Sequence, residues 1–384
     1  MKVLYIAEDY IYSKVHHLLC NSIVEAASRM DLTIYSVLRS NKKRQFDISG
    51  FFEEKKITIL NMSIESRLKM YLYKYDFLYK QNVKYNWLKN NYNNLSNTNI
   101  VHAATLFSEG SVARAINKDY GIPYIVSIRG TDINFYFKYM HHLHKLGKDI
   151  LNNAYKIVFI TPKLRDNFFN LRTLRPIKNR LLEKSCVIPN GVEDFWLQNK
   201  NFIRNEVDPY SIIYIGRFDK NKNVKKLAKA VLILQKKYKN MSLTMVGGGG
   251  CQHEQIIALC EKYPNVLNYV GAIYNEEKLC EIIRKHGIFA MVSHSETFGL
   301  VYVEALSQGL PVLYSLNQGI DGMFAENVGE KADSRSLKSI VGALDKLITN
   351  YSNYDSIENS INKFDWKTIA NNYIKIYNSM SNVF

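Results

Sequence analysis

The fold is decided by Ser293-His-Ser-Glu-Thr-Phe-Gly-Leu-Val-Tyr-Val-Glu-Ala-Leu-Ser-Gln-Gly-Leu-Pro311 and by the apolar residues on either side of it. Residues 288–292 (Ile-Phe-Ala-Met-Val) are typical of a buried strand, and residues 310–314 (Leu-Pro-Val-Leu-Tyr) indicate a second strand after Gly309 ends a helix. A strand, a loop, a helix and a strand in this order predict a βαβ unit. Ligands of such units bind at the carboxyl ends of the strands.

Two acidic residues, Glu296 and Glu304, lie on either side of the predicted helix start. The unpaired backbone N–H groups of Phe298, Gly299 and Leu300 would converge there, and the positive end of the helix dipole favours an anionic group such as phosphate. Carboxylates at two depths can accept hydrogen bonds from two sets of hydroxyls, as on a sugar and a ribose. The pattern favours nucleotide-sugar binding. The alternative is an ordinary amphipathic helix with Glu296 near its N-terminus and Glu304 on a solvated face.

Short apolar strands and helical segments alternate along the rest of the chain as well. The strand candidates of the first half are residues 3–7, 32–37, 57–60, 100–103, 124–128 and 156–160, and helical patterns lie at about 14–29 and 109–118. This alternation predicts an α/β protein with parallel sheets. The second half repeats the alternation from Ile212 to about Asn350, so the two halves should resemble each other in architecture.

The length of the chain indicates more than one domain, because 384 residues are too many for one compact core. We predict an N-terminal domain at 1–199, a linker at 200–210, a second domain at 211–360 and a final helical segment at 361–384. The linker is placed where the chain is polar, lacks periodicity and reaches Pro209.

The charge of the chain is unevenly distributed. The net charge is +16, with 30 Lys and Arg against 17 Asp and Glu in residues 1–200 but 21 against 18 in residues 201–384. A basic first half suits an anionic partner, either lipid headgroups or nucleic acid. Because no nucleic-acid-binding motif is present, we favour the membrane surface over nucleic acid.

The cysteines and the hydropathy of the chain indicate the cellular compartment in which the protein works. The five cysteines are scattered without a Cys-x-x-Cys pair, which favours a reducing cytoplasm over a disulfide framework or a structural zinc site. No apolar run approaches the roughly 18 residues of a membrane span. Glu8 and Asp9 come too early for a secretion signal, so the first residues are interpreted as a buried strand.

Four further motifs stand in register with Glu296 and Glu304. They are Tyr214-Ile-Gly-Arg-Phe-Asp-Lys-Asn-Lys222, Thr244-Met-Val-Gly-Gly-Gly249, Asn268-Tyr-Val-Gly271 and Val187-Ile-Pro-Asn-Gly-Val192. Together the motifs resemble retaining glycosyltransferases of the GT-B fold, especially glycosyltransferase family 4 (glycosyl transferases group 1). The resemblance covers most of the chain and is strongest from residue 187 to 314. It implies two Rossmann-like, doubly wound domains that face a central cleft, with the C-terminal helix crossing back to the first domain.

The resemblance assigns the donor site to the second domain. Arg217 and Lys222 would hold the leaving diphosphate as its charge develops, Glu296 would lie near the transferred sugar, and Glu304 would bind the ribose hydroxyls. Backbone positions of the same pocket would be Gly216, Gly247, Gly248, Gly271, Phe298, Gly299 and Leu300. For Gly247 and Gly248 the alternative is a tight turn without ligand contact. No cofactor and no metal ion are implied, because the chain lacks the Asp-x-Asp that bridges metal and diphosphate in the other large glycosyltransferase fold.

The first domain is expected to present the acceptor. Ser127-Ile-Arg-Gly-Thr-Asp132 lies where the family often has His-Gly-x-Asp, so Arg129 replaces the histidine and cannot act as a titrating base. Asp132 fits a hydroxyl-binding role, with a helix N-cap as the alternative. His102 resembles a residue of the cleft but can equally be a satisfied core histidine. Glu8-Asp-Tyr-Ile-Tyr-Ser13 replaces the Gly-Gly loop that usually follows the first strand.

Two basic segments of the first half favour contact with an anionic membrane surface. Arg67–Lys89 carries aromatics and lysines at helical spacing, as interfacial helices do, and Arg172–Lys184 is a second basic run. The alternative for the first segment is an ordinary helix that packs into its domain.

We therefore predict a retaining, metal-independent glycosyltransferase that moves a sugar from a nucleotide-sugar donor to a glycan or a polyprenyl-diphosphate-linked glycan. The predicted setting is bacterial surface polysaccharide biosynthesis (O-antigen, capsule or lipopolysaccharide), in the cytoplasm and peripherally on the inner face of the cell membrane. The alternatives are a GT-B nucleotide-sugar epimerase and a non-catalytic module that binds membranes or nucleic acid.

Overall fold

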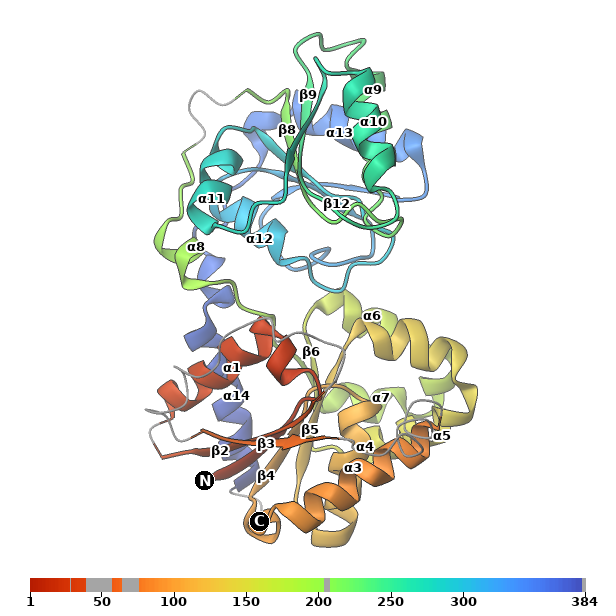
Figure 1. The fold of residues 1–384 in the computed structure, drawn as a ribbon, viewed down its shortest axis with the longest axis vertical. Helices are drawn as coiled ribbons and strands as arrows, with labels where there is room; N and C mark the ends of the chain where they lie inside the picture. The colour runs from red at the N-terminus through yellow and green to blue at the C-terminus, as the bar shows by residue number, and fades with distance from the viewer. Residues whose placement is uncertain (28, 39–56, 64–75, 204–207, 382–384) are drawn as a thin grey trace. The chain divides into compact units, whose positions relative to one another are not determined.

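The computed structural model describes residues 1–27, 29–38, 57–63, 76–203 and 208–381 of the chain. The chain divides into two compact units, each built around one parallel sheet (Figure 1). The first unit holds residues 1–160, 165–191 and those from 366 onward, and the second holds 161–164 and 192–365. The division falls at residues 191 and 192 rather than 199 and 200, because α8 (Asp194–Gln198) packs on α12 (Leu300–Ser307) of the second unit.

The first unit contains a seven-stranded sheet in the order β3-β2-β1-β4-β5-β6-β7. Its strands are β1 (Lys2–Ile6), β2 (Asp31–Val37), β3 (Ile57–Met62), β4 (Ile100–Ala103), β5 (Tyr124–Ile128), β6 (Lys156–Phe159) and β7 (Ser185–Val187). Every strand predicted from the first half is present, and all neighbours pair in parallel. The edge strand β7 was not predicted as a strand, because its residues are only partly buried and form no apolar run.

Helices connect these strands. They are η1 (Tyr10–Tyr12), α1 (Lys14–Ala26), α3 (Phe77–Asn91), η3 (Leu95–Asn97), α4 (Ser108–Tyr120), η4 (Asp132–Phe137), η5 (His141–Leu143), α5 (His144–Asn153), α6 (Pro162–Phe169), η6 (Arg172–Ile177), α7 (Lys178–Glu183) and α14 (Trp366–Ser381). Figure 1 shows α1 and α14 on one side of the sheet and α3 and α4 on the other, so both of its faces are covered. Coverage of both faces explains why the central strands β1, β4, β5 and β6 are mainly apolar and buried.

The second unit contains a six-stranded parallel sheet in the order β10-β9-β8-β11-β12-β13. Its strands are β8 (Ser211–Gly216), β9 (Ser242–Gly247), β10 (Leu267–Gly271), β11 (Ile288–Ala290), β12 (Val312–Ser315) and β13 (Gly329–Ala332). Besides α8 and α12, its helices are α9 (Val224–Leu234), α10 (His253–Lys262), α11 (Glu276–Arg284), α13 (Leu337–Thr349), η7 (Tyr351–Asn353) and η8 (Ile361–Phe364). In Figure 1, α9, α10 and α13 lie on one side of the sheet and α11 and α12 on the other.

The strand order of both sheets reverses at one internal point. In the first unit this point lies between β1 and β4, and in the second it lies between β8 and β11. Successive connections leave to opposite faces at such a point, so a crevice opens outside the carboxyl ends of the two strands, where doubly wound proteins bind their ligands. The predicted α/β, doubly wound architecture is confirmed for both units.

The C-terminal helix α14 belongs to the first unit, as predicted. It packs on α1 and buries Ile369, Tyr373 and Tyr377 in the core of that unit. Gly191 makes room for the start of the helix, because a Cβ atom there would lie 2.5 Å from the Trp366 ring. The chain therefore returns to its first unit by burying one apolar face of its last helix.

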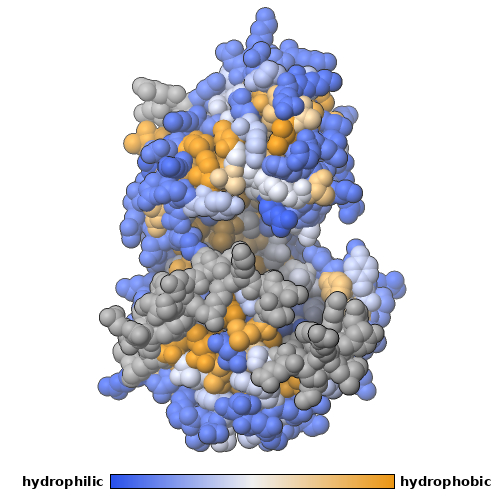
Figure 2. Space-filling model, in the orientation of Figure 1, coloured by the Kyte–Doolittle hydropathy of each residue, from blue (hydrophilic) through white to orange (hydrophobic). Residues whose placement is uncertain are grey.

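The exterior is mainly hydrophilic on the face shown in Figure 2, where hydrophobic residues form separate groups on each unit. None of the helices described by the structure is both long enough and apolar enough to cross a bilayer.

Candidate active site

The loop after β11 leads into α12 through a glycine that no other residue can replace without strain. Gly299 has a φ of 81°, and a Cβ atom there would lie 2.6 Å from the ring of Tyr302. That ring is fixed in turn, because its hydroxyl donates to the backbone oxygen of Met291 at the end of the strand region. α12 begins at Leu300, so its first backbone N–H groups lie at the carboxyl ends of the strands, as predicted.

The loop after β12 holds the backbone of Glu296 in place. The N–H of Glu296 donates to Oε1 of Gln318 at 3.1 Å, and its carbonyl accepts from the N–H of Gly319 at 2.8 Å. Gly319 has a φ of 52°, and a Cβ atom there would lie 3.1 Å from Cγ of Glu296. Gln318 and Gly319 were not among the predicted site residues, although the Gly-rich sequence after the strand is a signal for a close backbone approach.

The turn after β8 brings Lys222 to Glu296. The side chain of Asn221 bonds both backbone groups of Ser295, accepting from the N–H at 3.0 Å and donating to the oxygen at 2.9 Å. Lys222 follows directly, and its Nζ lies 2.6 Å from Oε2 of Glu296. The side chains of Lys222 and Glu296 are 25% and 13% exposed, so the pair lies in a partly enclosed place open to solvent. The sequence predicted both residues but not the contact.

Arg217 and Glu304 lie near this pair in the chain but are oriented by other contacts. The backbone oxygen of Arg217 accepts from the hydroxyl of Tyr214 at 2.8 Å, while its side chain is exposed. Within the described ranges, no carboxylate lies within ion-pair distance of its guanidinium. Glu304 is half-buried in α12, whose neighbouring residues Tyr302 and Val303 face the core. Arg217 therefore places an exposed cation just after β8, and no carboxylate of the described residues pairs with it.

The predicted glycines lie at the carboxyl ends of three neighbouring strands. Gly216, Gly247 and Gly271 end β8, β9 and β10, and Gly248 follows β9 directly. Gly247 has a φ of 133°, and a Cβ atom there would lie 2.0 Å from the oxygen of Gly216. The close approach of the two strand ends therefore requires a glycine at 247, and contact of Gly247 with a ligand stays a prediction.

The switch point of the first unit carries buried charges. Asp132 accepts from the backbone N–H groups of Arg129, at 2.8 Å, and of Leu106 and Phe107. Burial nevertheless raises the pKa of its carboxyl to about 7. The Nε of Arg129 donates to the oxygen of Ala104 at 3.2 Å, so the guanidinium is anchored beside the end of β4.

His102 lies inside the core of the first unit rather than at its surface. Its Nδ1 lies 2.7 Å from the hydroxyl of Tyr377, and its Nε2 lies 3.3 Å from Oγ of Ser127. Burial, with a smaller effect of Arg129, lowers its pKa well below the ordinary value. The interpretation of His102 as a satisfied core histidine is therefore the one that this environment favours.

A group of buried charges replaces the Gly-Gly loop after β1 and was not predicted. Glu8 is ion-paired with the buried Lys84 and with Lys80, whose Nζ lies 3.1 Å from Oε2. Glu109 accepts from the backbone N–H of Glu8 at 3.1 Å and from the hydroxyl of Thr105. The acids at 8 and 109 are visible in the sequence, but no local pattern shows that Lys80 and Lys84 of α3 reach Glu8.

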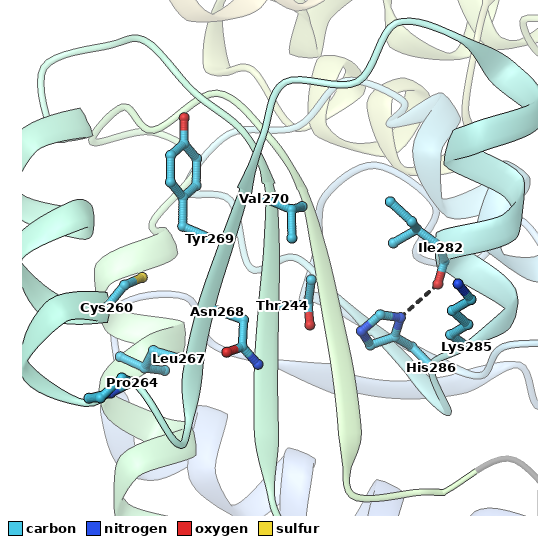
Figure 3. A pocket seen from close by; sticks show the side chains of 10 residues that line it. All are labelled: Thr244, Cys260, Pro264, Leu267, Asn268, Tyr269, Val270, Ile282, Lys285 and His286. Atoms are coloured by element: carbon cyan, nitrogen blue, oxygen red, sulfur yellow. Dashed lines mark hydrogen bonds between the residues drawn. The ribbon is translucent and has the colours of Figure 1, made fainter.

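A hollow of about 560 Å³ lies elsewhere, along the edge strand β10 and the end of α11 (Figure 3). Thr244, Asn268 and Val270 line it from the strands, and Ile282 and His286 from the other side. None of the predicted catalytic residues lines it, so the chemistry is assigned to the strand ends instead. Across the described part of the chain, no group of three or more His, Cys, Asp and Glu side chains is placed to hold a metal ion.

Each of the two units has a doubly wound parallel sheet, and the chain shares the GT-B fold of the solved structures to which it is similar. Residues 198–364 match the profile of the family described as Glycosyl transferases group 1. The resemblance to this group and the GT-B fold, both predicted from the sequence, are thereby confirmed. Family 4 membership and retention of configuration stay predictions.

Individual relatives agree with this assignment. The chain is 22% identical over 253 residues to TuaC of Bacillus subtilis, named as a teichuronic acid biosynthesis glycosyltransferase, with 64% of this chain and 60% of TuaC covered. Sucrose-phosphate synthase of Thermosynechococcus elongatus matches with a TM-score of 0.70 at 17% identity, covering 100% of both chains. Anabaena HepE in complex with UDP matches with a TM-score of 0.67 at 14% identity, covering 99% of this chain and 100% of that one.

Proposed function

We propose that this chain is a glycosyltransferase that moves a sugar from a nucleotide-sugar donor to a glycan or lipid-linked glycan. The observation that carries the proposal is the meeting of Lys222 and Glu296 at the switch point of the second sheet, beside the start of α12. These residues lie inside the segment that matches glycosyl transferases group 1. The HepE structure, which contains UDP, supports a nucleotide as the bound part of the donor.

In this proposal the positively charged groups bind the diphosphate, and the carboxylate of Glu304 binds the ribose. The diphosphate gains negative charge as the bond to the sugar breaks, and fixed cations that meet this charge lower the barrier. Arg217 offers a guanidinium that no described carboxylate neutralises, and the N–H groups at the start of α12 add a positive dipole end. Glu304, about a turn further along α12, accepts hydrogen bonds from the ribose hydroxyls in this proposal.

The ion pair between Lys222 and Glu296 would break when the donor binds. Lys222 is held by the carboxylate of Glu296 at 2.6 Å. A diphosphate competes for the same ammonium, and a lysine that turns to phosphate leaves Glu296 able to accept from a sugar hydroxyl. One exchange of partners thus prepares both the leaving-group site and the sugar site.

The acceptor is assigned to the first unit, whose switch point carries Arg129 and Asp132. Because Arg129 stays charged, it binds or orients the acceptor and takes no proton from it. We propose a retaining reaction by same-face attack, without a metal ion. A polyprenyl-diphosphate-linked acceptor at the anionic inner face of a bacterial membrane fits the basic first half of the chain, and the name of TuaC supports surface polysaccharide biosynthesis.

Release of nucleoside diphosphate from a panel of nucleotide-sugars, with and without lipid extracts as acceptor, tests this proposal. We expect one donor to be consumed faster with acceptor, with transfer of its sugar seen by mass spectrometry. Conversion of a donor to its epimer without any acceptor would show an epimerase instead. Arg217→Ala and Glu296→Ala variants as active as the wild type would contradict the assigned site.

A further inference from the structure

The segment between β5 and α5 exposes two aromatic side chains. Phe135 is 46% exposed and Tyr139 is 60% exposed, and their ring centroids lie 6.3 Å apart. Nζ of Lys138 lies 5.0 Å from the centre of the Tyr139 ring, within cation–π distance. The base of the segment is rigid, because Phe137 packs in the core against Phe107. The exposed rings are therefore carried by an ordered support.

Basic residues are frequent in the two segments next to these rings, and acidic residues are absent from residues 133–148 and 167–182. Residues 133–148 contain three lysines and three histidines but no Asp or Glu, and residues 167–182 contain three arginines and one lysine but no Asp or Glu. The two segments pack together, since Oγ1 of Thr173 lies 3.4 Å from Nδ1 of His144. Lys138, Lys145, Arg172 and Arg175 are all exposed.

We propose that this surface, formed by Phe135, Tyr139, Lys138, Lys145, Arg172 and Arg175, docks the enzyme on an anionic lipid bilayer. Aromatic rings enter the headgroup region, and lysine and arginine beside them attract anionic headgroups. The proposal rests on the proposed function only in that a membrane-embedded acceptor gives docking its purpose. A nucleic acid would also be attracted by the cations, but the exposed rings of Phe135 and Tyr139 beside Lys138 match the aromatic and basic residues found at membrane interfaces, so lipid is favoured.

The location differs from the segment that the sequence favoured. Of Arg67–Lys89, residues 67–75 lie outside the described part of the chain. The described helix α3 packs on α4 and buries Lys84, Tyr85 and Leu88 in the first unit. Its lysine at 84 neutralises Glu8 and so cannot contact lipid. The second basic run, Arg172–Lys184, does contribute to the proposed surface through η6.

Vesicle flotation with the full chain tests the surface. The probes are vesicles of phosphatidylglycerol mixed with phosphatidylcholine, and vesicles of phosphatidylcholine alone. One variant replaces Lys138, Lys145, Arg172 and Arg175 by Gln, and its matched control replaces the exposed Lys229, Lys236, Lys239 and Lys278 of the second unit by Gln. A second variant, Phe135→Ser with Tyr139→Ser, is matched by Tyr274→Ser, at a residue that is 93% exposed.

The wild type should bind the anionic vesicles more tightly than the neutral ones. The four-Gln variant should lose up to about a thousandfold in partition, at about 1 kcal/mol for each cation removed, and the aromatic variant several-fold, while both controls bind like the wild type. All variants should unfold at the wild-type temperature and keep the same thermal shift with UDP.

Equal binding to neutral vesicles, unchanged binding of either variant, or preferential binding of a single-stranded oligonucleotide that vesicles cannot displace would overturn the proposal. If no nucleotide binds but the vesicle results hold, the proposed function fails and the docking surface stands.

Discussion

Lys222 and Glu296 come from different loops of the second unit, and the side chain of Asn221 fixes how they meet. Each of the two charged groups alone fits an ordinary solvated position. The two side chains lie 2.6 Å apart, beside the start of α12 and at the point where the strand order reverses. This contact is the reason that we assign both residues to the donor site. Because the proposed roles of Lys222 and Glu296 depend on the chemistry of single side chains, single substitutions test them.

Lys222→Ala should lower turnover by about a hundredfold to a thousandfold, because a cation that meets the developing diphosphate charge is lost. Lys225→Ala is the matched control, since Lys225 lies in the first turn of α9 and its Nζ donates to Oε1 of Gln255 at the surface. Steady-state kinetics with the identified donor and acceptor provide the measurement. A loss confined to KM would show uniform binding rather than stabilisation of the leaving group.

Asp132 gives the stability of the first unit a defined pH dependence. Burial raises the pKa of its carboxyl from an ordinary 3.8 to about 7, so the folded state binds the proton more tightly than the unfolded state. The contribution to stability is present below about pH 4 and is lost as pH rises through about 7. Urea unfolding should therefore show a free energy of unfolding that falls over this range in the wild type relative to Asp132→Asn.

The substituted amide of Asp132→Asn cannot titrate, and it faces a backbone N–H, so the variant should be less stable overall but lack this slope. Glu8 should not titrate between about pH 4 and 7. Burial alone would raise the pKa of its carboxyl, but the stronger combined effect of Lys84 and Lys80 lowers this pKa to about 2. Parallel pH profiles for the two proteins would show that Asp132 does not titrate in this range.

At the scale of elements, local sequence predicted the strands and helices well because apolar runs between turn residues are a local signal. β1 to β6 and β8 to β12 follow such runs, whereas β7 has only partly buried residues and gives none. The same limit applies to the site. Glu296, Lys222 and the glycines could be found by motif, but Gln318, Asn221 and the Glu8–Lys84 pair depend on contacts between segments far apart in the chain.

Gly299→Ala tests the loop that starts α12. The φ of 81° and the 2.6 Å approach of a Cβ to the Tyr302 ring should together cost about 1–3 kcal/mol of unfolding free energy. Gly342→Ala is a suitable control, because nothing lies within 4 Å of a Cβ there and the position is inside α13, so the substitution should be neutral or stabilise slightly. Chemical denaturation distinguishes the two, and equal stability of both variants would contradict the steric argument.

For the whole molecule, α14 links the last residues of the chain to the first unit. A chain that ends at Asp365 loses the side chains of Ile369, Tyr373 and Tyr377 from the core of that unit. We expect this truncated chain to be insoluble or to lose the cooperative unfolding of the first unit, while Lys375→Ala, at an exposed position on α14, unfolds like the wild type. Calorimetry measures the thermal unfolding of both proteins. An unfolding transition of the truncated chain that matches the wild type would contradict the assignment of α14 to the core of the first unit.

The central claim is that the switch point of the second sheet binds the nucleotide diphosphate of the donor. Isothermal titration of the full chain with UDP, GDP and ADP, repeated with Arg217→Ala and with Lys225→Ala, tests it most directly. We expect one nucleotide to bind the wild type and Lys225→Ala equally, and to bind Arg217→Ala at least about tenfold more weakly. Equal affinity of the wild type and Arg217→Ala for the bound nucleotide would contradict it.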